Sequence, residues 1–274
     1  MTGTPRNGVE LPDLTLGTWD IRTPAQAETA VGAAWASGYR GIDSAACYEN
    51  EDVIRRAIDS CGIPRDGLTV TSKVWNDAHD EAAARAAFDA SERRLGRIDI
   101  YLIHWPGPVP RFLKVWRALE ELFEDGRTAG IGVSNFMVPQ LEILLEHARI
   151  RPMLNQVECH LRFVDRPLLD FCRREGIAVQ AFSPLGAGSG VLDDPVLREW
   201  ADRLGVSPAQ TALAYLRQLG IYPLPKSSNP DRIAENAGFR NVRIPDDGMA
   251  ALAGRNRLVR TNKDPFGWFG QGYE

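Results

Sequence analysis

Four polar side chains of the sequence could together move a proton. Asp43, Tyr48, Lys73 and His104 lie in the segments RGID, AACYEN, TVTSKVW and YLIHWP, each at or just after a short apolar run. An ammonium inside an apolar strand, as at Lys73, needs a carboxylate partner, and Asp43 on the neighbouring run at the same depth is the natural one. The hydroxyl of a tyrosine has an ordinary pKa of about 10, which a nearby ammonium lowers by favouring phenolate. The pattern therefore predicts a tuned proton donor at Tyr48.

His104 adds a second donor to this group. Its imidazole follows the run after Lys73, so it could reach the same point as the tyrosyl hydroxyl. Two donors on one oxygen polarise a carbonyl and protonate the alkoxide as it forms. Taken singly, a buried ion pair, a packed tyrosine and a core histidine would explain these residues. Together they indicate acid–base chemistry on a carbonyl.

The elements that must position these residues alternate along the chain. Eight short runs rich in β-branched residues predict strands, beginning at Leu14, Arg40, Leu68, Ile98, Thr128, Pro152, Ile177 and Ile221. Segments with helical periodicity lie between them, over Pro24–Ser37, Glu51–Ser60, Glu81–Leu95, Leu113–Asp125, Pro139–His147, Pro167–Glu175 and Pro208–Leu219. Further short helices are expected at RIAENAGF and near Asp247–Arg255.

Eight such units in one domain over residues 1–274 predict an α/β fold, a single (β/α)8 TIM barrel. An open doubly wound sheet is the alternative. The turn NGVELPD is expected to form an N-terminal hairpin that closes the barrel, and the aromatic C-terminus to form a substrate loop. In a TIM barrel the chemistry lies at the C-terminal ends of the strands, where all four polar residues fall.

The composition of the chain limits the kinds of molecule that it is expected to bind. A net charge of −4 lacks the basic excess of a nucleic-acid or membrane-surface binder, so a small-molecule partner is expected. No run approaches the roughly 18 apolar residues of a membrane span, and the N-terminus lacks a signal peptide, which predicts a cytoplasmic protein. The four cysteines, Cys47, Cys61, Cys159 and Cys172, are far apart and are interpreted as reduced thiols.

Carbonyl reduction also needs a hydride donor, but no GxGxxG motif follows a strand. The GAGSG loop at Gly186–Gly190 could wrap a pyrophosphate through its backbone N–H groups, or be only a mobile turn. Lys226, Ser227 and Arg232 offer two cations and a hydroxyl at the start of a short helix. That arrangement could hold a phosphomonoester, although a solvated basic turn is the simpler explanation of these residues alone.

Ordered blocks along almost the whole chain resemble the aldo-keto reductase family. They are GYRGIDSAACYENE, TSK, LIHWP, GVSNF, NQVECH, FSPLG and PKSSNPDRIAEN. The short loop after His104, PGPVPRF, and the compact C-terminus are similar to the bacterial 2,5-diketo-D-gluconate reductase branch. The resemblance implies an NADPH-dependent monomer that reduces aldehydes or ketones, with Tyr48, Lys73, Asp43 and His104 as catalytic tetrad and no metal.

The resemblance also implies which residues hold NADPH or NADP+. Ser134, Asn135 and Gln156 match the ligands of the nicotinamide carboxamide, and Phe182 matches the stacking aromatic, where many members have tyrosine. The remaining cofactor positions are Thr18, Trp19, Ser183, Leu185, Gly186, Lys226, Ser227, Ser228, Arg232, Glu235 and Asn236. Ser228 replaces an apolar or threonine residue common in the family. Substrate contacts are expected at Trp19, Tyr48, Trp75, His104, Trp105 and Trp268, with Phe266 and Phe269 as further candidates.

Two other functions are compatible with parts of the sequence. A metal-dependent barrel hydrolase could use His104, Glu158 and His160, but no HxH pair ends the first strand and few further ligands are at hand. A barrel that binds NADPH as a sensor would need no turnover, and the intact tetrad disfavours it.

Overall fold

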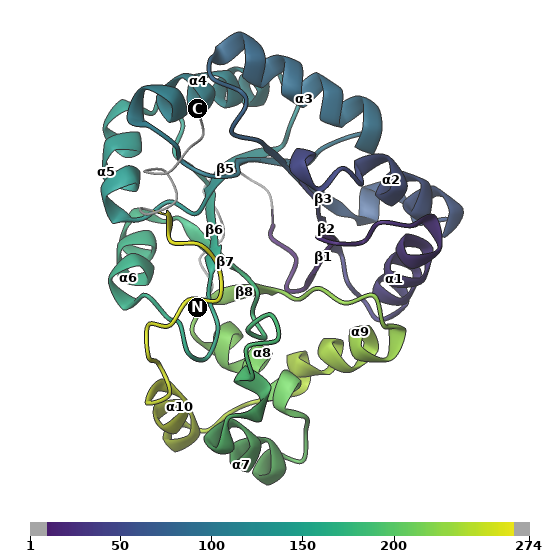
Figure 1. The fold of residues 1–274 in the computed structure, drawn as a ribbon, viewed down its shortest axis with the longest axis vertical. Helices are drawn as coiled ribbons and strands as arrows, with labels where there is room; N and C mark the ends of the chain where they lie inside the picture. The colour runs from purple at the N-terminus through teal and green to yellow at the C-terminus, as the bar shows by residue number, and fades with distance from the viewer. Residues whose placement is uncertain (1–9, 266–274) are drawn as a thin grey trace.

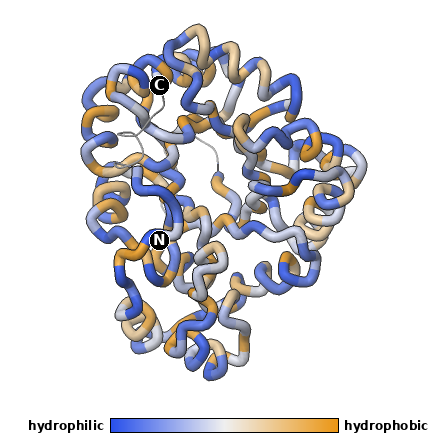
Figure 2. The backbone as a smooth tube through the Cα atoms, viewed as in Figure 1, coloured by the Kyte–Doolittle hydropathy of each residue, from blue (hydrophilic) through white to orange (hydrophobic). Residues whose placement is uncertain are grey.

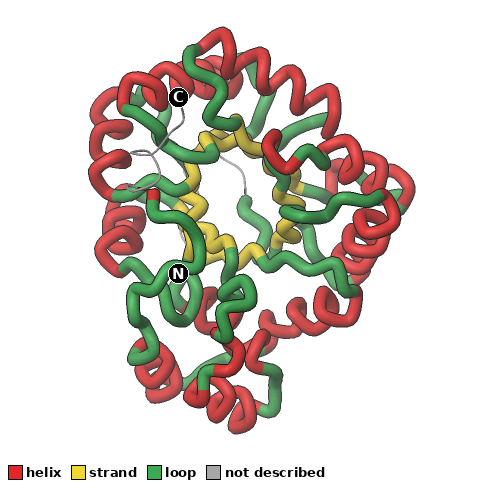
Figure 3. The backbone as a smooth tube through the Cα atoms, viewed as in Figure 1, coloured by secondary structure: helices red, strands yellow, loops and turns green. Residues whose placement is uncertain are grey.

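Eight parallel strands form one sheet that closes on itself. The computed structural model describes residues 10–265, and Figures 1 and 3 show the strands as an inner ring surrounded by helices. The strands pair in sequence order: β1 (Thr15–Gly17), β2 (Gly41–Asp43), β3 (Thr69–Val74), β4 (Ile100–Ile103), β5 (Gly130–Ser134), β6 (Leu154–Glu158), β7 (Ala178–Phe182) and β8 (Ile221–Leu224). Gly17 N–H donates to the carbonyl oxygen of Pro225 at 3.1 Å, and Gly17 bridges to Lys226, which joins the last strand to the first. The predicted (β/α)8 barrel is confirmed. The alternative of an open sheet is wrong, because the first and last strands, which would be its free edges, are joined.

Helices cover the outer face of the barrel, most of them at the predicted places. They are α1 (Pro24–Ala36), α2 (Glu51–Ser60), α3 (Glu81–Leu95), α4 (Val109–Glu124), α5 (Val138–His147), α6 (Arg166–Glu175), α7 (Pro195–Leu204), α8 (Pro208–Gln218), α9 (Pro230–Ala237) and α10 (Asp246–Ala253). Capping boxes begin two of them, at Thr23 with Gln26 and at Ser207 with Gln210. Figure 2 shows hydrophobic and hydrophilic residues interspersed along this outer ring.

The sequence analysis missed one helix and misplaced the start of another. It did not predict α7, although Asp194 accepts a hydrogen bond from Val196 N–H, Pro195 occupies the first turn, and Leu197 and Trp200 are buried one turn apart. Helix α4 begins at Val109, four residues before the predicted Leu113, because a proline in the first turn is tolerated where N–H groups have no partner.

The ends of the chain differ in part from expectation. Residues 10–13 contain no strand, so this part of the turn forms no hairpin, and the rest of the expected hairpin lies outside the described residues. The segment after α10 returns across the barrel, where Thr261 N–H and Oγ1 both bond to Oε1 of Glu158 at the end of β6. Phe266, Trp268 and Phe269 lie outside the described residues.

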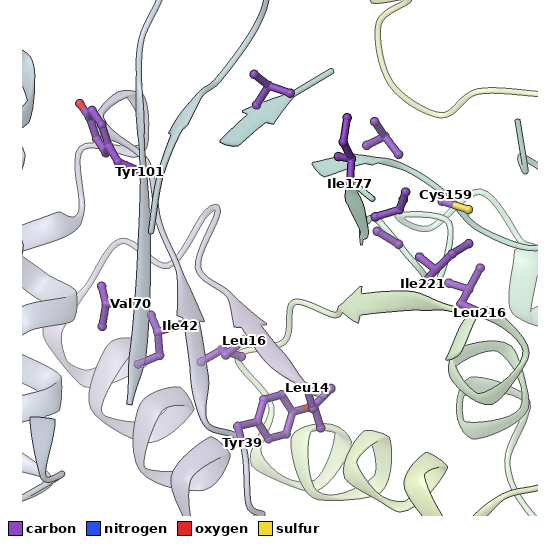
Figure 4. Close-up of a cluster of buried hydrophobic side chains, with 14 of the residues drawn as sticks. Leu14, Leu16, Tyr39, Ile42, Val70, Tyr101, Cys159, Ile177, Leu216 and Ile221 are labelled. Carbon is purple, nitrogen blue, oxygen red and sulfur yellow. The ribbon is translucent and has the colours of Figure 1, made fainter. Parts of the chain in front are cut away.

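Apolar side chains fill two layers on either side of the strands. The larger cluster lies between strands and helices, and Figure 4 shows part of it, with Leu16 and Ile42 from the first two strands and Ile221 from the last. A smaller cluster combines residues of β4, β6 and β8 with residues that precede β1 and β6: Leu11, Ile100, Leu102, Met153, Leu154 and Tyr222. Since Tyr101, between Ile100 and Leu102, packs against Phe88 of α3, the smaller cluster faces the barrel interior.

The tight interior predicts that Gly132→Ala is destabilising. A Cβ at Gly132 would lie 2.7 Å from the carbonyl oxygen of Leu154 and 2.9 Å from Cδ2 of Leu102, so backbone must move. We expect the free energy of unfolding, measured by urea titration, to fall by about 1–3 kcal/mol. Gly32→Ala in α1, where the added methyl meets only the sulfur of Cys61 at 3.3 Å, is the control and should cost less. Equal stability of both variants would contradict this account of the interior.

Candidate active site

Strand register places Asp43 and Lys73 inside the barrel. Asp43 pairs with Thr71 and Thr71 with Ile100, while Lys73 pairs with Leu102, and both Ile100 and Leu102 face the interior. The two strands are therefore offset, with Lys73 two residues beyond the partner of Asp43, and not at the same depth as expected. The long lysine side chain spans the offset, and Nζ lies 2.5 Å from Oδ1 of Asp43. The predicted ion pair is confirmed.

Hydrogen bonds from other strands complete this buried pair. Lys73 and Asp43 are only 0% and 2% exposed. Lys73 Nζ also donates to the backbone oxygen of Ser44 at 2.8 Å, and Gln156 Nε2 donates to Oδ2 of Asp43 at 2.8 Å. The second N–H of Gln156 reaches Oε1 of Gln180, also at 2.8 Å. Two buried charges are tolerable because each finds several partners. Sequence analysis assigned no role to Gln180, although a glutamine within the apolar run IAVQAF was a usable signal.

Tyr48 lies above the pair, in a short 3-10 helix over Ala46–Tyr48 that follows β2. Lys73 Nζ is 5.1 Å from the centroid of the Tyr48 ring. Desolvation, followed by the Asp43 charge, raises the pKa of Tyr48 well above its ordinary value. The net shift of this pKa is upward and not the expected lowering, because the Lys73 ammonium is matched by a carboxylate and the half-buried phenol is largely shielded from water. Tyr48 therefore keeps its proton at neutral pH.

His104 lies beside Tyr48, directly after β4. Its ring stands edge-on to Tyr48, with centroids 5.7 Å apart, and to Trp75, with centroids 5.1 Å apart. Burial and the Lys73 charge lower the pKa of His104 well below its ordinary value. The imidazole is therefore neutral at physiological pH and can donate a hydrogen bond from one ring nitrogen. The structure thus brings together all four residues that the sequence analysis grouped.

Two buried polar residues that the sequence analysis left without a role support this arrangement. Asn50 Nδ2 donates to the backbone oxygens of Thr18 at 2.8 Å and Ile21 at 3.0 Å, which fixes the loop after β1. Glu51 accepts a 2.6 Å hydrogen bond from Ser72 Oγ, next to Lys73. Both residues belong to the segment YENE, directly after Tyr48. Adjacent polar residues at the start of a helix gave a signal, but their burial was not visible in the sequence.

The expected carboxamide ligands cluster at the ends of β5 and β6. Ser134 Oγ donates to the backbone oxygen of Gln156 at 2.8 Å. Asn135, in the left-handed region at φ 64°, directs Nδ2 to the backbone oxygen of His104 at 3.0 Å and to Ser134 Oγ at 3.1 Å. Because the amide N–H groups of Asn135 and Gln156 are used inside the protein, their oxygens are the atoms available to an incoming amide.

The next group of expected cofactor residues follows β7. Phe182 ends the strand, Ser183 accepts a hydrogen bond from Asn262 Nδ2 at 3.3 Å, and Gly186 N–H closes a turn onto the backbone oxygen of Ser183 at 2.8 Å. Leu185 packs against the main core. A cavity of about 310 Å³ adjoins this loop and is lined by His160, Arg162, Ala187, Gly188, Ser189, Val259, Arg260 and Thr261.

The expected phosphate site lies at the end of β8 and the start of α9. Lys226, Ser228 and Arg232 are exposed, and Ser227 is half-buried with Oγ accepting from Asn229 N–H at 3.0 Å. Glu235 is exposed, whereas Asn236 is only 3% exposed. Both expected cations are thus presented to solvent beside a helix N-terminus.

The described substrate candidates lie just after β1, β3 and β4. Trp19 is 61% exposed, Trp75 half-buried and Trp105 buried, while Trp268 lies outside the described residues. The buried Arg111 of α4 donates to the backbone oxygens of Trp75 at 2.8 Å and Trp105 at 3.1 Å. Arg111 therefore holds the loops after β3 and β4, a role that its position on a helix did not reveal.

The residues of the alternative metal site do not assemble. Within residues 10–265, no group of three or more His, Cys, Asp or Glu side chains could hold a metal ion. His160 Nε2 lies 3.2 Å from Oε1 of Glu158, the carboxylate that also anchors Thr261, whereas His104 packs against Tyr48.

The described helices include none long and apolar enough to cross a membrane.

Comparisons with known proteins match this chain to one family over nearly all of its length. A model of the aldo/keto reductase family matches residues 13–256. The chain is 42% identical to the 9,11-endoperoxide prostaglandin H2 reductase of Trypanosoma cruzi, over 99% of this chain and 97% of that protein. It is 41% identical to the glyoxal reductase of Bacillus subtilis, over 94% of each. The crystal structure of an aldo-keto reductase from a Medee basin deep-sea metagenome library is 34% identical, with a TM-score of 0.92, over 95% of this chain and 97% of that one.

The raised pKa of Tyr48 can be tested by ultraviolet titration. The tyrosinate absorbance of the wild type minus that of Tyr48→Phe should show no titration below about pH 10, because burial and Asp43 disfavour the phenolate. In urea-unfolded protein the same difference should titrate near the ordinary value. A folded-state midpoint below that of the unfolded protein would restore the lowering that the sequence suggested.

Proposed function

The chain belongs to the aldo/keto reductase family, and we propose that it reduces aldehyde or ketone carbonyls to alcohols with NADPH. Membership of this family makes it an oxidoreductase. The observation that carries the proposal is the buried Asp43–Lys73 pair directly beneath a protonated Tyr48 and a neutral His104. Such a pair, completed by Gln156, is costly to build and supports two neutral donors at one opening.

The residues at the ends of β5 to β8 fit a nicotinamide dinucleotide. The bound cofactor supplies the hydride that becomes the new C–H bond. Asn135 and Gln156 oxygens and the Ser134 hydroxyl would hold the carboxamide, and Phe182 would stack on the ring. Thr18 and Trp19 at the end of β1 would complete the nicotinamide side. Along the rest of the cofactor we place Ser183, Leu185 and Gly186 at the pyrophosphate, Lys226, Ser227, Ser228 and Arg232 at the 2′-phosphate, and Glu235 and Asn236 at the adenine.

Tyr48 and His104 carry the acid–base step in this proposal. His104 donates a hydrogen bond to the carbonyl oxygen and Tyr48 transfers its proton to that oxygen as the alkoxide forms. An alkoxide is a much stronger base than a phenolate, so Tyr48 remains acidic enough to protonate it. Lys73 and Asp43 orient the phenol, and in the oxidative direction the phenolate takes the proton back.

Small carbonyl compounds are the proposed substrates. Trp19, Trp75 and Trp105 offer apolar walls, and Trp268 is proposed to join them. The name of the Bacillus relative, glyoxal reductase, favours compounds with neighbouring carbonyl groups. Sugar acids remain the expected substrates of the 2,5-diketo-D-gluconate reductase-like branch, so a panel of aldehydes, α-keto esters, diketones and sugar acids discriminates between the classes. We also propose that residues 1–274 act as one cytoplasmic, monomeric domain.

Tyr48→Phe tests the proton donor. We expect kcat for carbonyl reduction to fall by at least ~10²-fold, because the phenyl ring has no proton to transfer, while NADPH affinity stays unchanged. Tyr101→Phe is a matched control, since this buried tyrosine of β4 packs against Phe88 of α3, away from the barrel interior. Retention of more than about a tenth of wild-type kcat by Tyr48→Phe, with chemistry rate-limiting, would remove Tyr48 from this role.

Arg232→Ala tests the choice of NADPH. Charge-assisted hydrogen bonds to a phosphate are worth roughly 1.5–3 kcal/mol each, and about tenfold in affinity follows from 1.4 kcal/mol. We expect fluorescence titration to show that the wild type binds NADPH more tightly than NADH. In the variant, the ratio of the NADH to the NADPH dissociation constant should fall by at least about tenfold. Arg243→Ala removes another exposed arginine and should leave both affinities unchanged. Equal weakening of the two cofactors by Arg232→Ala would refute the phosphate assignment.

A further inference from the structure

The sulfur of Cys47 lies against the ring of His104. Cys47 precedes Tyr48 in the short helix after β2, and its Sγ is 3.4 Å from Nδ1 of His104, within hydrogen-bonding distance for sulfur. The side chain is half-buried and forms no disulfide. The sequence analysis treated Cys47 only as a reduced thiol, because its neighbour, His104, is 57 positions away in the chain.

The chemistry of the two groups decides which of them donates. A neutral imidazole carries one N–H and one acceptor nitrogen. Burial lowers the pKa of His104 and raises the pKa of the Cys47 thiol to about 12, so both groups are neutral near pH 7. Sulfur is a weak acceptor, whereas an unprotonated ring nitrogen is a good one. The favoured arrangement is therefore S–H donating to Nδ1.

This contact selects between two forms of the ring. With Nδ1 as acceptor, the single ring hydrogen lies on Nε2. In the other tautomer Nε2 carries a lone pair, which would repel a carbonyl oxygen instead of binding it. The edge-on contacts of His104 with Tyr48 and Trp75 restrain the plane of the ring, but aromatic edges do not determine which nitrogen carries the hydrogen.

We propose that Cys47 is a positioning residue, whose S–H donates to Nδ1 of His104 and so fixes the ring with its hydrogen on Nε2, ready to donate to the substrate oxygen. The proposal rests on the proposed carbonyl reduction for its functional meaning. The hydrogen bond itself is a property of the cofactor-free protein. It can therefore be tested whether or not the reaction is assigned correctly.

Two substitutions separate the donor from the volume of the side chain. Cys47→Ser keeps a hydrogen-bond donor, and Cys47→Val keeps an apolar side chain of similar size without one. Nitrogen-15 spectra of the cofactor-free protein near pH 7 would report both ring nitrogens of His104, identified among the four histidines by their loss in His104→Gln.

In the wild type and in Cys47→Ser, Nδ1 should resonate as a hydrogen-bonded acceptor and Nε2 as a protonated nitrogen. In Cys47→Val the Nδ1 resonance should lose the hydrogen-bond shift, with a larger share of the other tautomer. A wild-type ring protonated on Nδ1, or a Cys47→Val spectrum identical to that of the wild type, would overturn the proposal.

Kinetics give an independent measure of the same contact. Cys47→Val should lower kcat for carbonyl reduction by about threefold to tenfold, as expected for loss of one hydrogen bond, with NADPH affinity unchanged. Cys47→Ser should stay within about twofold of the wild type. Equal losses in both variants, or a loss in Cys47→Ser alone, would contradict the assignment of Cys47 as donor.

Discussion

The buried ion pair between Lys73 and Asp43 is the constraint on which the candidate site depends. A charge withdrawn from water is tolerated only with a close partner and further hydrogen bonds, and breaking such a pair costs about 3–5 kcal/mol. Here the partners come from several parts of the barrel: Ser44 after β2, Gln156 in β6 and, through Gln156, Gln180 in β7. The full set of hydrogen bonds around the pair therefore forms only when β2, β3, β6 and β7 are all in place, which couples the geometry of the site to completion of the fold.

The electrostatic consequence is that two uncharged hydrogen-bond donors, Tyr48 and His104, lie above an ion pair whose charges balance. Tyr48 retains its proton because burial and the Asp43 carboxylate disfavour phenolate, and His104 stays uncharged because burial and the Lys73 ammonium disfavour imidazolium. Both effects favour the protonation states that reduction of a carbonyl needs, a hydroxyl proton to transfer and an N–H to donate. In the proposed mechanism Lys73 orients the phenol and balances the charge of Asp43.

The barrel divides the proposed work between its two halves. The ends of β1 to β4 carry the proposed tetrad and the proposed apolar walls, whereas the ends of β5 to β8 carry the groups that fit a dinucleotide. Gln156 links the halves, because its amide nitrogen holds Asp43 while its oxygen is available to an amide ligand. Thr261 and Asn262, after α10, contact Glu158 and Ser183, so this segment also lies against the half that we propose binds the dinucleotide.

By itself the sequence determined the eight strands, the barrel and the grouping of Asp43, Tyr48, Lys73 and His104, because alternation of apolar runs and helical periodicity follows local chemistry. Helix α7 carried similar local signals at Asp194 and Pro195 and was missed only by the interpretation. Tertiary structure alone decided the two-residue offset between Asp43 and Lys73, the roles of Gln180 and Arg111, and the contact of Cys47 with His104. It also reversed the expected pKa of Tyr48. Spacing along a chain gives the order of side chains, whereas register, burial and the direction of each side chain arise only when distant segments pack.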